Sequence, residues 1–447
     1  MKFSKDTKIF LHKLSVIALP IIIQELINSA VNITDTFMIS SLGEAPITAV
    51  GLANQIFFLF ILFVFGINSG ASVFMGQFWG AKDTKSIHKT MGIAFISSQV
   101  VATTFATLAF FKADLLIGYY SSDAVVIDLG TQYLRVACFT YFLSAFSFTL
   151  NTAQKSTGHT KYPMLTTLIA FFTNIILNYY FIFIAKEGVV GAAKGTLIAR
   201  TVELIAQIVI IRGLKLPILG RMKNYIAFDK KFVAEFFKKA GPVIANEMMW
   251  ATGVTQYTRF YGQVGTEAQT SVQLANSMKQ LFMVIGIGVG SSSGIILGNL
   301  LGANKINKAI RYAKKYIVTA GILSTIMGLG LIIGSPFIVQ LFSNISPQVR
   351  DDTMKILIII SLLIPVLTFN YMGVVGILRS GGDTFVCLLI DALSVWLLGV
   401  PFTYLGIRMG LPIYLVVACS YMEEIGKFLF VVIRVRQRKW AQNITAS

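Results

Sequence analysis

The amino-acid sequence predicts an all-α membrane protein with twelve transmembrane helices in two homologous six-helix lobes. Composition and long apolar stretches predict the class, and an internal repeat predicts the two lobes. Of the 447 residues, 55% are hydrophobic and 13% are charged, whereas roughly a quarter of the residues in a soluble domain are charged. Residues 45–81 contain no charged side chain, and a bilayer crossing needs only about 20 apolar residues. Because backbone groups in lipid must bond within their own segment, we expect these stretches to be helices.

Twelve apolar segments are long enough to cross a bilayer. We predict spans at residues 14–40, 46–80, 90–112, 124–152, 163–185, 189–211, 234–260, 270–302, 308–338, 352–378, 384–407 and 411–436. The loops between them alternate in charge, and the strongly basic set includes residues 2–13, 82–89, 212–239, 305–315 and 434–439. The positive-inside rule places basic loops in the cytoplasm. We therefore expect a multi-pass protein of the cell (inner or plasma) membrane with both termini in the cytoplasm.

The net charge of +18 also occurs in proteins that bind nucleic acid. Here the basic residues fall in short loops between apolar spans rather than along one face, as the positive-inside rule predicts. We therefore expect a lipid bilayer and small molecules as partners, no nucleic acid, and a monomer. The cysteines Cys138, Cys387 and Cys419 lie far apart in apolar segments, which indicates neither a disulfide framework nor a metal site.

The two halves of the chain repeat each other. Pro242 follows Pro20 by 222 residues (242 − 20), and the same offset relates Leu-Ala-Asn at 52–54 to Leu-Ala-Asn at 274–276. With six spans in each half, both halves have the same orientation in the membrane, so the repeat is parallel. We predict lobes at residues 1–211 and 233–447, joined by a basic cytoplasmic linker at 212–232. Large duplicated helical membrane proteins are mostly transporters, although duplication can also yield a purely structural product.

A polar stripe runs along the first predicted span. Its members are four, four and three residues apart and share one helix face: Gln24, Asn28, Asn32 and Asp35. A carboxylate at the centre of a membrane helix costs about 2.5–3.5 kcal/mol on insertion scales and is rarely kept without use. Lipid offers these groups no partners, so the stripe should face a wet cavity. The favoured interpretation is a proton or cation site at Asp35, and the alternative is a buried structural hydrogen-bond network.

Two asparagines of the fifth predicted span also share a face. Asn174 and Asn178 are four residues apart. Asparagine can coordinate Na⁺ through its side-chain oxygen or donate to a carboxylate, but in membrane helices it also links neighbouring helices. Close to Asp35, the pair would complete a cation-coupling site, with Na⁺ as the only metal ion that the sequence indicates.

Further carboxylates lie in other predicted spans. Glu25 and Glu247, beside Gln24 and Asn246, occupy equivalent positions of the repeat, five residues after a proline. These four residues and Asp391 are candidates for a substrate site or for a cation site in the second lobe. The alternatives are placement of the two glutamates at a hydrated helix end, and a structural hydrogen bond from Asp391 to a neighbouring helix.

Several kinds of chemistry lack their sequence signature. The glycines of Ile285–Gly290 (IGIGVG) lie in an apolar span without a preceding strand, so they do not fit a nucleotide-binding loop. No Walker A sequence is present, which argues against ATP hydrolysis by this chain, and no cofactor is expected. All three histidines, at positions 12, 88 and 159, lie in loops or near span ends. An intramembrane enzyme or a scaffold is therefore an unfavoured alternative, and we expect no catalytic residues.

Several motifs together resemble the multidrug and toxic compound extrusion (MATE) family, bacterial type, over nearly the whole chain. In the first half they are Pro20 with Asp35-Thr36, residues 70–80 (GASVFMGQFWG) and residues 188–196 (GVVGAAKGT). In the second half they are residues 294–303 (GIILGNLLGA) and 378–384 (LRSGGDT). The sequence departs from the NorM-type pattern at Thr368 and Trp250, where that branch has acids. Glu247 and Asp391 are the candidates to replace those acids.

The resemblance implies a V-shaped carrier of two six-helix lobes that exports organic, often cationic, compounds in exchange for H⁺ or Na⁺. It implies that Asp35 is the first-lobe cation site, with Asn174 and Asn178 beside it. A lipid-linked oligosaccharide flippase of the same wider superfamily is the alternative within this fold. Such a flippase would need a cationic cavity for pyrophosphate, whereas the candidate residues here are mostly acidic.

Overall fold

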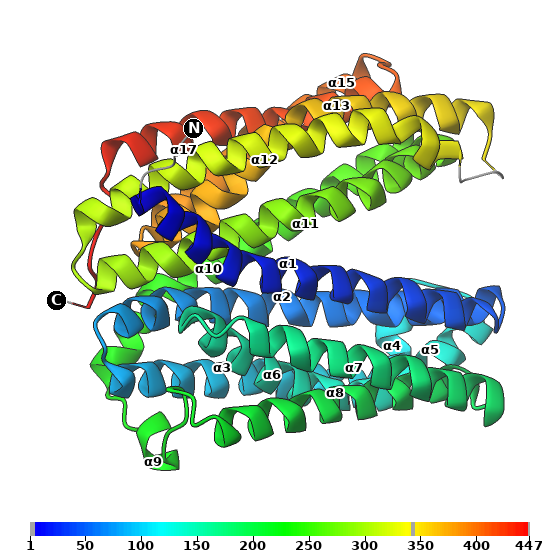
Figure 1. Cartoon of the computed structure of the whole chain (residues 1–447). Helices are drawn as coiled ribbons and strands as arrows, with labels where there is room; N and C mark the ends of the chain where they lie inside the picture. The colour runs from blue at the N-terminus through cyan, green and yellow to red at the C-terminus, as the bar shows by residue number, and fades with distance from the viewer. Residues whose placement is uncertain (1–4, 341–344, 446–447) are drawn as a thin grey trace. The chain divides into compact units, whose positions relative to one another are not determined.

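The computed structural model describes residues 5–340 and 345–445, and every regular element within them is helical. Figure 1 shows the course of the chain. The first half contains α1 (Lys5–Ser40), α2 (Glu44–Gly80), α3 (Thr84–Phe111), α4 (Ala113–Gly118), α5 (Ala124–Ala137), α6 (Phe139–Ser156), α7 (Lys161–Tyr179), the π-helical segment η1 (Tyr180–Ile184) and α8 (Gly188–Gly213). The all-helical prediction is therefore confirmed for this part of the chain.

The second half repeats this order after a short linker helix, α9 (Met222–Tyr225). It contains α10 (Lys230–Val264), α11 (Thr266–Gly302), α12 (Ile306–Gln340), α13 (Pro347–Tyr371), η2 (Met372–Leu378), α14 (Thr384–Leu393), η3 (Ser394–Gly399), α15 (Val400–Arg408), α16 (Ile413–Ser420) and α17 (Met422–Gln437). The segment between the halves is shorter than the predicted 212–232, because α8 extends to Gly213 and α10 begins at Lys230.

Each of the twelve predicted spans coincides with a helix or with consecutive helical segments. Within the described residues, eight helices are long and apolar enough to cross a membrane, and the bent pair α5–α6 makes nine. The remaining three spans are α8, α10 and the α16–α17 pair, which carry charged residues such as Arg200, Glu247 and Lys427. Charged side chains in such helices face the protein interior or a hydrated cavity rather than lipid.

Two compact units form the molecule, residues 23–244 and residues 1–22 with 245–447. They differ from the predicted lobes at α1 and α10. The start of α1 packs with the second half, because Phe10, Leu14 and Ile21 belong to one apolar core with Leu297 and Tyr316. Phe10 contacts the Tyr316 ring edge-on, with ring centroids 5.2 Å from Tyr312 and 5.0 Å from Tyr316.

The start of α10 packs in the same way with the first half. The ring of Phe236 stacks on Phe74 with 5.8 Å between centroids, and Gly70 lies so close to Ala240 that a Cβ at position 70 would contact the Ala240 Cα at 2.6 Å. Apolar burial therefore assigns each end of these two helices to its unit. The proline of each helix, Pro20 or Pro242, lies within three residues of the point where the assignment changes.

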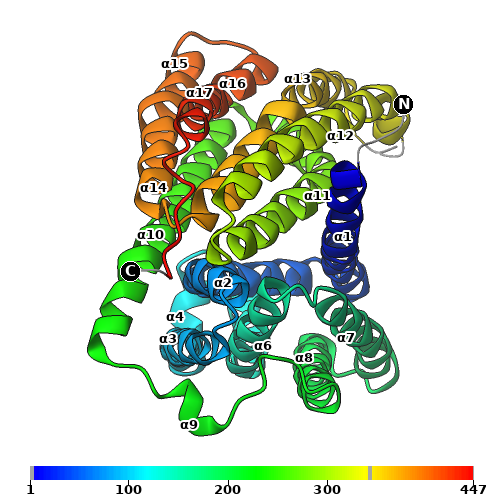
Figure 2. The same cartoon turned by 60° about the vertical axis from the view of Figure 1, so that its left-hand side comes forward.

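The unit of residues 23–244 is a bundle in which α2, α3, α6, α7 and α8 run side by side (Figures 1 and 2). Its core is built on α2, α5 and α6, where Phe60 stacks on Tyr141 with 4.8 Å between ring centroids. This packing holds the inner faces of α1, α5, α7 and α8 around the polar stripe that the sequence predicts on α1.

The other unit contains two apolar cores, one around Leu297, Tyr316 and Ile377 and one around Leu331, Ile356 and Val416. In Figure 2, α11, α12 and α13 lie side by side within it. The segment η3 interrupts the span between α14 and α15, and π-helical turns in a span often mark functional positions.

Candidate functional site

A cavity of about 530 Å³ opens within the unit of residues 23–244. Three members of the α1 stripe line it: Asn28, Asn32 and Asp35. The wall is completed by α2, α5, α6, α7 and α8, which contribute Asn54, Phe57, Phe58, Tyr133, Tyr141, Asn174, Asn178, Thr196, Ala199 and Arg200 among others. The predicted wet face of α1 therefore lies against a cavity with both polar and aromatic walls.

Asp35 is half-buried and is held by the two asparagines of α7. The Asn178 side-chain amide donates to Asp35 Oδ1 at 2.7 Å and also lies 3.4 Å from Asn174 Oδ1. The amide of Asn174 donates in turn to Thr196 Oγ1 of α8 at 3.4 Å. The structure thus brings together the three residues predicted to couple a cation, and a chain of polar contacts links α1, α7 and α8.

Gly195 sets the position of the Asn178 side chain. A Cβ at position 195 would overlap Asn178 Oδ1. Asn178 is 1% exposed, and within the described part of the chain its Oδ1 accepts no hydrogen bond. The glycine therefore gives room for the oxygen and leaves the amide nitrogen directed at Asp35. The sequence showed Gly195 only as part of the GVVGAAKGT motif and gave no sign of this role.

Arg200 is the cationic residue of the cavity wall. Its Nη1 lies 2.8 Å from Glu203 Oε2, so the two side chains form an ion pair within α8. The Arg200 side chain is 33% exposed and the Glu203 side chain only 3%. Counted with Glu203, which lies outside the wall and pairs with the guanidinium, the site has one more negative than positive charge when Asp35 is ionised.

The structure corrects the stripe at Gln24. Gln24 is buried, is not part of the cavity wall, and donates to Thr167 Oγ1 of α7 at 3.0 Å. The hydroxyl of Thr167 lies 3.5 Å from Glu203 Oε1. Glu25 also lies off the wall, half-buried, with its Oε2 3.5 Å from the amide of Asn28. Helix spacing placed Gln24 on the same face as the cavity residues. Spacing does not show that α7 covers this part of the face.

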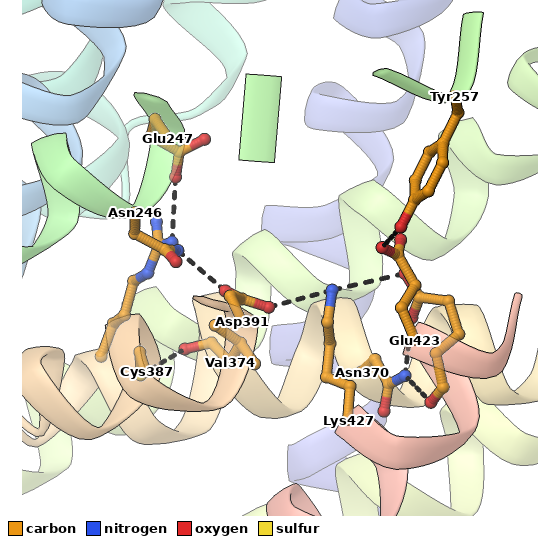
Figure 3. Close-up of polar contacts among 11 residues, drawn as sticks. Asn246, Glu247, Tyr257, Asn370, Val374, Cys387, Asp391, Glu423 and Lys427 are labelled. Atoms are coloured by element: carbon orange, nitrogen blue, oxygen red, sulfur yellow. Dashed lines mark hydrogen bonds and ion pairs between the residues drawn. The ribbon is translucent and has the colours of Figure 1, made fainter. Parts of the chain in front are cut away.

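The candidate residues of the second half lie in a separate network of buried charges, drawn in Figure 3. Glu247 pairs with Arg379 at 2.9 Å. Asn246 donates to Asp391 Oδ2 at 2.8 Å, and the other oxygen of Asp391 lies 2.9 Å from Lys427 Nζ. Cations of the protein itself therefore neutralise both Glu247 and Asp391, unlike Asp35.

The last helix adds two more carboxylates to this network. Lys427 pairs with Glu424 at 3.3 Å as well as with Asp391, and Asn370 donates to Glu424 Oε2 at 2.7 Å. Glu423 instead accepts a hydrogen bond from the Tyr257 hydroxyl. Although Glu423 and Lys427 are four residues apart on one helix, Lys427 turns toward Asp391 and Glu424 instead.

Sequence reasoning missed Arg379 and Lys427 as parts of a site. Arg379 falls between two predicted spans, and the structure places it directly after η2 with 3% of its surface exposed. Lys427 is 6% exposed. The available signal was the carboxylates of Glu247, Asp391 and Glu424 within predicted spans, because buried carboxylates need cationic partners.

A family model, MatE, matches the chain twice, over residues 20–180 and 242–405. The two matches start 222 residues apart (242 − 20), which confirms the internal repeat. Among the relatives, the chain is 25% identical to the uncharacterized transporter YisQ of Bacillus subtilis, over 95% of this chain and 93% of the relative. It is 23% identical to the probable multidrug resistance protein NorM of Listeria monocytogenes, over 95% and 94%.

Solved structures of transporters have the same fold. The MATE transporter VcmN of Vibrio cholerae superposes with a TM-score of 0.90 at 17% identity, over 98% of this chain and 100% of that chain. A MOP superfamily transporter from Pyrococcus furiosus superposes with a TM-score of 0.86 at 18% identity, over 98% and 100%. These likenesses establish the fold, and the two matches to the family model establish the family.

Proposed function

Because the chain belongs to the MatE family of multidrug and toxic compound efflux transporters, we propose that it is a secondary active antiporter that exports organic cations in exchange for H⁺ or Na⁺. Members of this family are membrane transporters and not enzymes. We further propose that the protein works as a monomer in the cell membrane, with both termini in the cytoplasm and no cofactor besides the transported ion. The observation that carries the proposal is the Asp35 carboxylate in a cavity whose other charges cancel.

The cavity has the size and chemistry to hold an organic cation. Its volume of about 530 Å³ lies within the range of small-molecule pockets, roughly 300–1,000 Å³. Phe57 and Phe58 of the wall offer aromatic faces that attract cations, and Asp35 offers the opposite charge. A pyrophosphate-bearing lipid would require an excess of positive charge, so the flippase alternative receives less support.

The contacts of Asp35 also supply a way to couple ion binding to a change of conformation. A hydrogen bond to an ionised carboxylate is about twice as strong as one between neutral groups. When H⁺ or Na⁺ neutralises Asp35, its bond to Asn178 weakens, and with it the link between α1 and α7. The cation thereby competes with an organic cation for the carboxylate and loosens the packing around the cavity. One charge crossing 100 mV releases about 2.3 kcal/mol, which can drive the exchange.

Replacement of Asp35 tests this proposal in cells. Asp35→Asn removes the charge and keeps the size, so ethidium efflux should fall to the level of cells without the transporter, while the amount of protein in the membrane stays the same. Asp128→Asn is the matched control, because Asp128 lies exposed on α5 and contacts Gln132 of its own helix. Normal efflux by Asp35→Asn would exclude Asp35 from the mechanism.

A further inference from the structure

The repeat places a tyrosine where the first half has its cavity carboxylate. Asp35-Thr36 of α1 corresponds to Tyr257-Thr258 of α10 at the offset of 222 (257 − 35). The second half therefore lacks an acid at this position of its own first helix. In the structure, a different helix of the second unit supplies a carboxyl group at this place.

Contacts in the two units establish which residues correspond on the later helices. There the offset is 224: the last residue of α17, Gln437, follows the last residue of α8, Gly213, by that number (437 − 213). With these two offsets, the first unit has the contact chain Gln24–Thr167–Glu203–Arg200, and the second has Asn246–Asp391–Lys427–Glu424. Every link of one chain is present in the other, so the correspondence holds in space.

Glu423 occupies the repeat position of Ala199 (423 − 199 = 224). Ala199 lines the first-unit cavity together with Asp35. In the second unit the side chain at this position is a carboxylate, and it contacts Tyr257, the counterpart of Asp35 (Figure 3). The second unit therefore retains a carboxyl group at the equivalent place, supplied by its last helix instead of its first.

The surroundings of Glu423 leave this carboxyl without a cation of its own. Glu423 and Tyr257 are each 7% exposed. Within residues 5–340 and 345–445, Glu423 forms no ion pair, since Lys427 is taken by Asp391 and Glu424. The titratable groups that face it from neighbouring helices are Tyr257 and Tyr261 of α10, Lys279 of α11 and Asp391 of α14, and those on its own helix α17 are Glu424 and Lys427.

Tight packing restricts what the carboxyl can bind. Gly399 of η3 closes the site, because a Cβ there would overlap the Tyr257 hydroxyl and lie 2.9 Å from Glu423 Oε2. A metal ion needs several oxygen ligands around a shared centre, whereas a proton needs only the carboxyl and one hydrogen-bond partner. Tyr257 is that partner, since a phenol can both donate to an ionised carboxylate and accept from a protonated one.

We propose that Glu423, hydrogen-bonded to Tyr257 and enclosed by Gly399, is a proton-binding site of the second unit, separate from Asp35. Binding adds one proton to a carboxylate oxygen of Glu423, and the phenol then changes from donor to acceptor. The site does not depend on the role of Asp35 in transport, because no residue of the first-unit cavity contributes to it.

Infrared difference spectra of the full-length protein in lipid nanodiscs, recorded between acidic and alkaline pH, test the proposal through the carbonyl band of protonated carboxylic acids. Glu423→Gln should remove one component of this band. Glu44→Gln, at an exposed position on α2, should remove no component that belongs to a buried carboxyl group. Asp35→Asn should leave the Glu423 component in place. A Glu423→Gln spectrum that superimposes on that of the wild type would overturn the proposal.

Tyr257→Phe gives a second test that keeps the carboxyl. A protonated carboxyl that loses its hydrogen-bond partner absorbs at higher frequency, so one component of the carbonyl band should shift upward relative to the wild type. This variant decides the matter if Glu423→Gln fails to fold, and an unshifted component would also overturn the proposal. A loss of ethidium efflux in Asp35→Asn bears on the first-unit cavity alone, so the two proposals can fail separately.

Discussion

The two units contain the same contact chain, but its charges face different surroundings. In the first unit, Glu203 and Arg200 form a neutral pair, and the carboxylate of Asp35 remains for the cavity. In the second unit, Lys427 stands in the place of Glu203 and binds two carboxylates at once. One unit therefore presents a charge to a ligand, while the other uses its charges to satisfy one another.

This difference shows that the position of a carboxylate in a membrane helix does not by itself define its role. Asp35 and Asp391 both lie within predicted spans, and both accept a hydrogen bond from an asparagine amide. Asp391 also has a lysine 2.9 Å away, whereas Asp35 has a cavity in front of it. The partner on the neighbouring helix distinguishes a structural charge from one that can bind a ligand.

The largest effect is expected from Lys427→Met. The substitution leaves Asp391 and Glu424 buried without a cation, and removal of one partner from a buried ion pair costs about 3–5 kcal/mol. Thermal unfolding in detergent should show a matching loss of stability. Arg200→Met removes the cation of the first unit, which is 33% exposed and pairs with one carboxylate instead of two, so we expect a smaller loss of about 1–3 kcal/mol. Equal losses in the two variants would contradict the distinction between the units.

A smaller effect is expected when a residue in the contact chain of the first unit is replaced by its counterpart from the second unit. Thr167→Asp introduces the carboxylate of Asp391 at its repeat counterpart (391 − 167 = 224), next to Glu203 and without a lysine. We expect it to destabilise the protein by about 1–3 kcal/mol, because a buried polar group without compensation costs that much. The double variant Thr167→Asp with Glu203→Lys should recover part of this loss in the same unfolding assay. If the losses of stability from the two substitutions simply add, the contact chains of the two units are not equivalent.

Gly195→Ala tests the geometry of the cavity. The added Cβ displaces Asn178 Oδ1 and pulls the amide away from Asp35. A loss of about ten-fold in the rate of ethidium efflux is expected, equivalent to roughly 1.4 kcal/mol. Gly213→Ala, at the end of the same helix with open space around its Cα, is the control. An unchanged rate in Gly195→Ala would show that Asn178 does not need its present position.

Glu25→Gln should have the smallest effect. Glu25 lies outside the cavity wall, and its carboxylate makes a long contact, 3.5 Å, to the amide of Asn28. We expect efflux within two-fold of the wild type, an energetic difference below about 0.4 kcal/mol. A loss comparable to that of Asp35→Asn would extend the functional site beyond the present cavity and along α1.

The sequence predicted the features that depend on one helix or on one repeat. Apolar length located the spans, the offset of Pro20 and Pro242 revealed the duplication, and helix periodicity aligned Asn28, Asn32 and Asp35 on one face. These features follow from helical geometry and from the bilayer, without knowledge of how the helices pack.

The features that depend on contacts between helices could not be predicted in this way. Gln24 shares the stripe but lies against Thr167, and Lys427 turns to a carboxylate 36 residues earlier in the chain (427 − 391) rather than to Glu423. Packing also assigns the start of α1 to the second-half unit. A single sequence contains no direct record of such pairings, because many faces of an apolar helix are equally suited to pack.

Flux in proteoliposomes under separately imposed H⁺ and Na⁺ gradients tests the central claim most directly. Wild-type protein should accumulate an organic cation against its gradient when one of the two ions is supplied, and Asp35→Asn should show no gradient-driven accumulation under either ion. Accumulation by Asp35→Asn equal to that of the wild type would contradict the account, because the carboxylate in the first-unit cavity would then not couple the ion to the substrate.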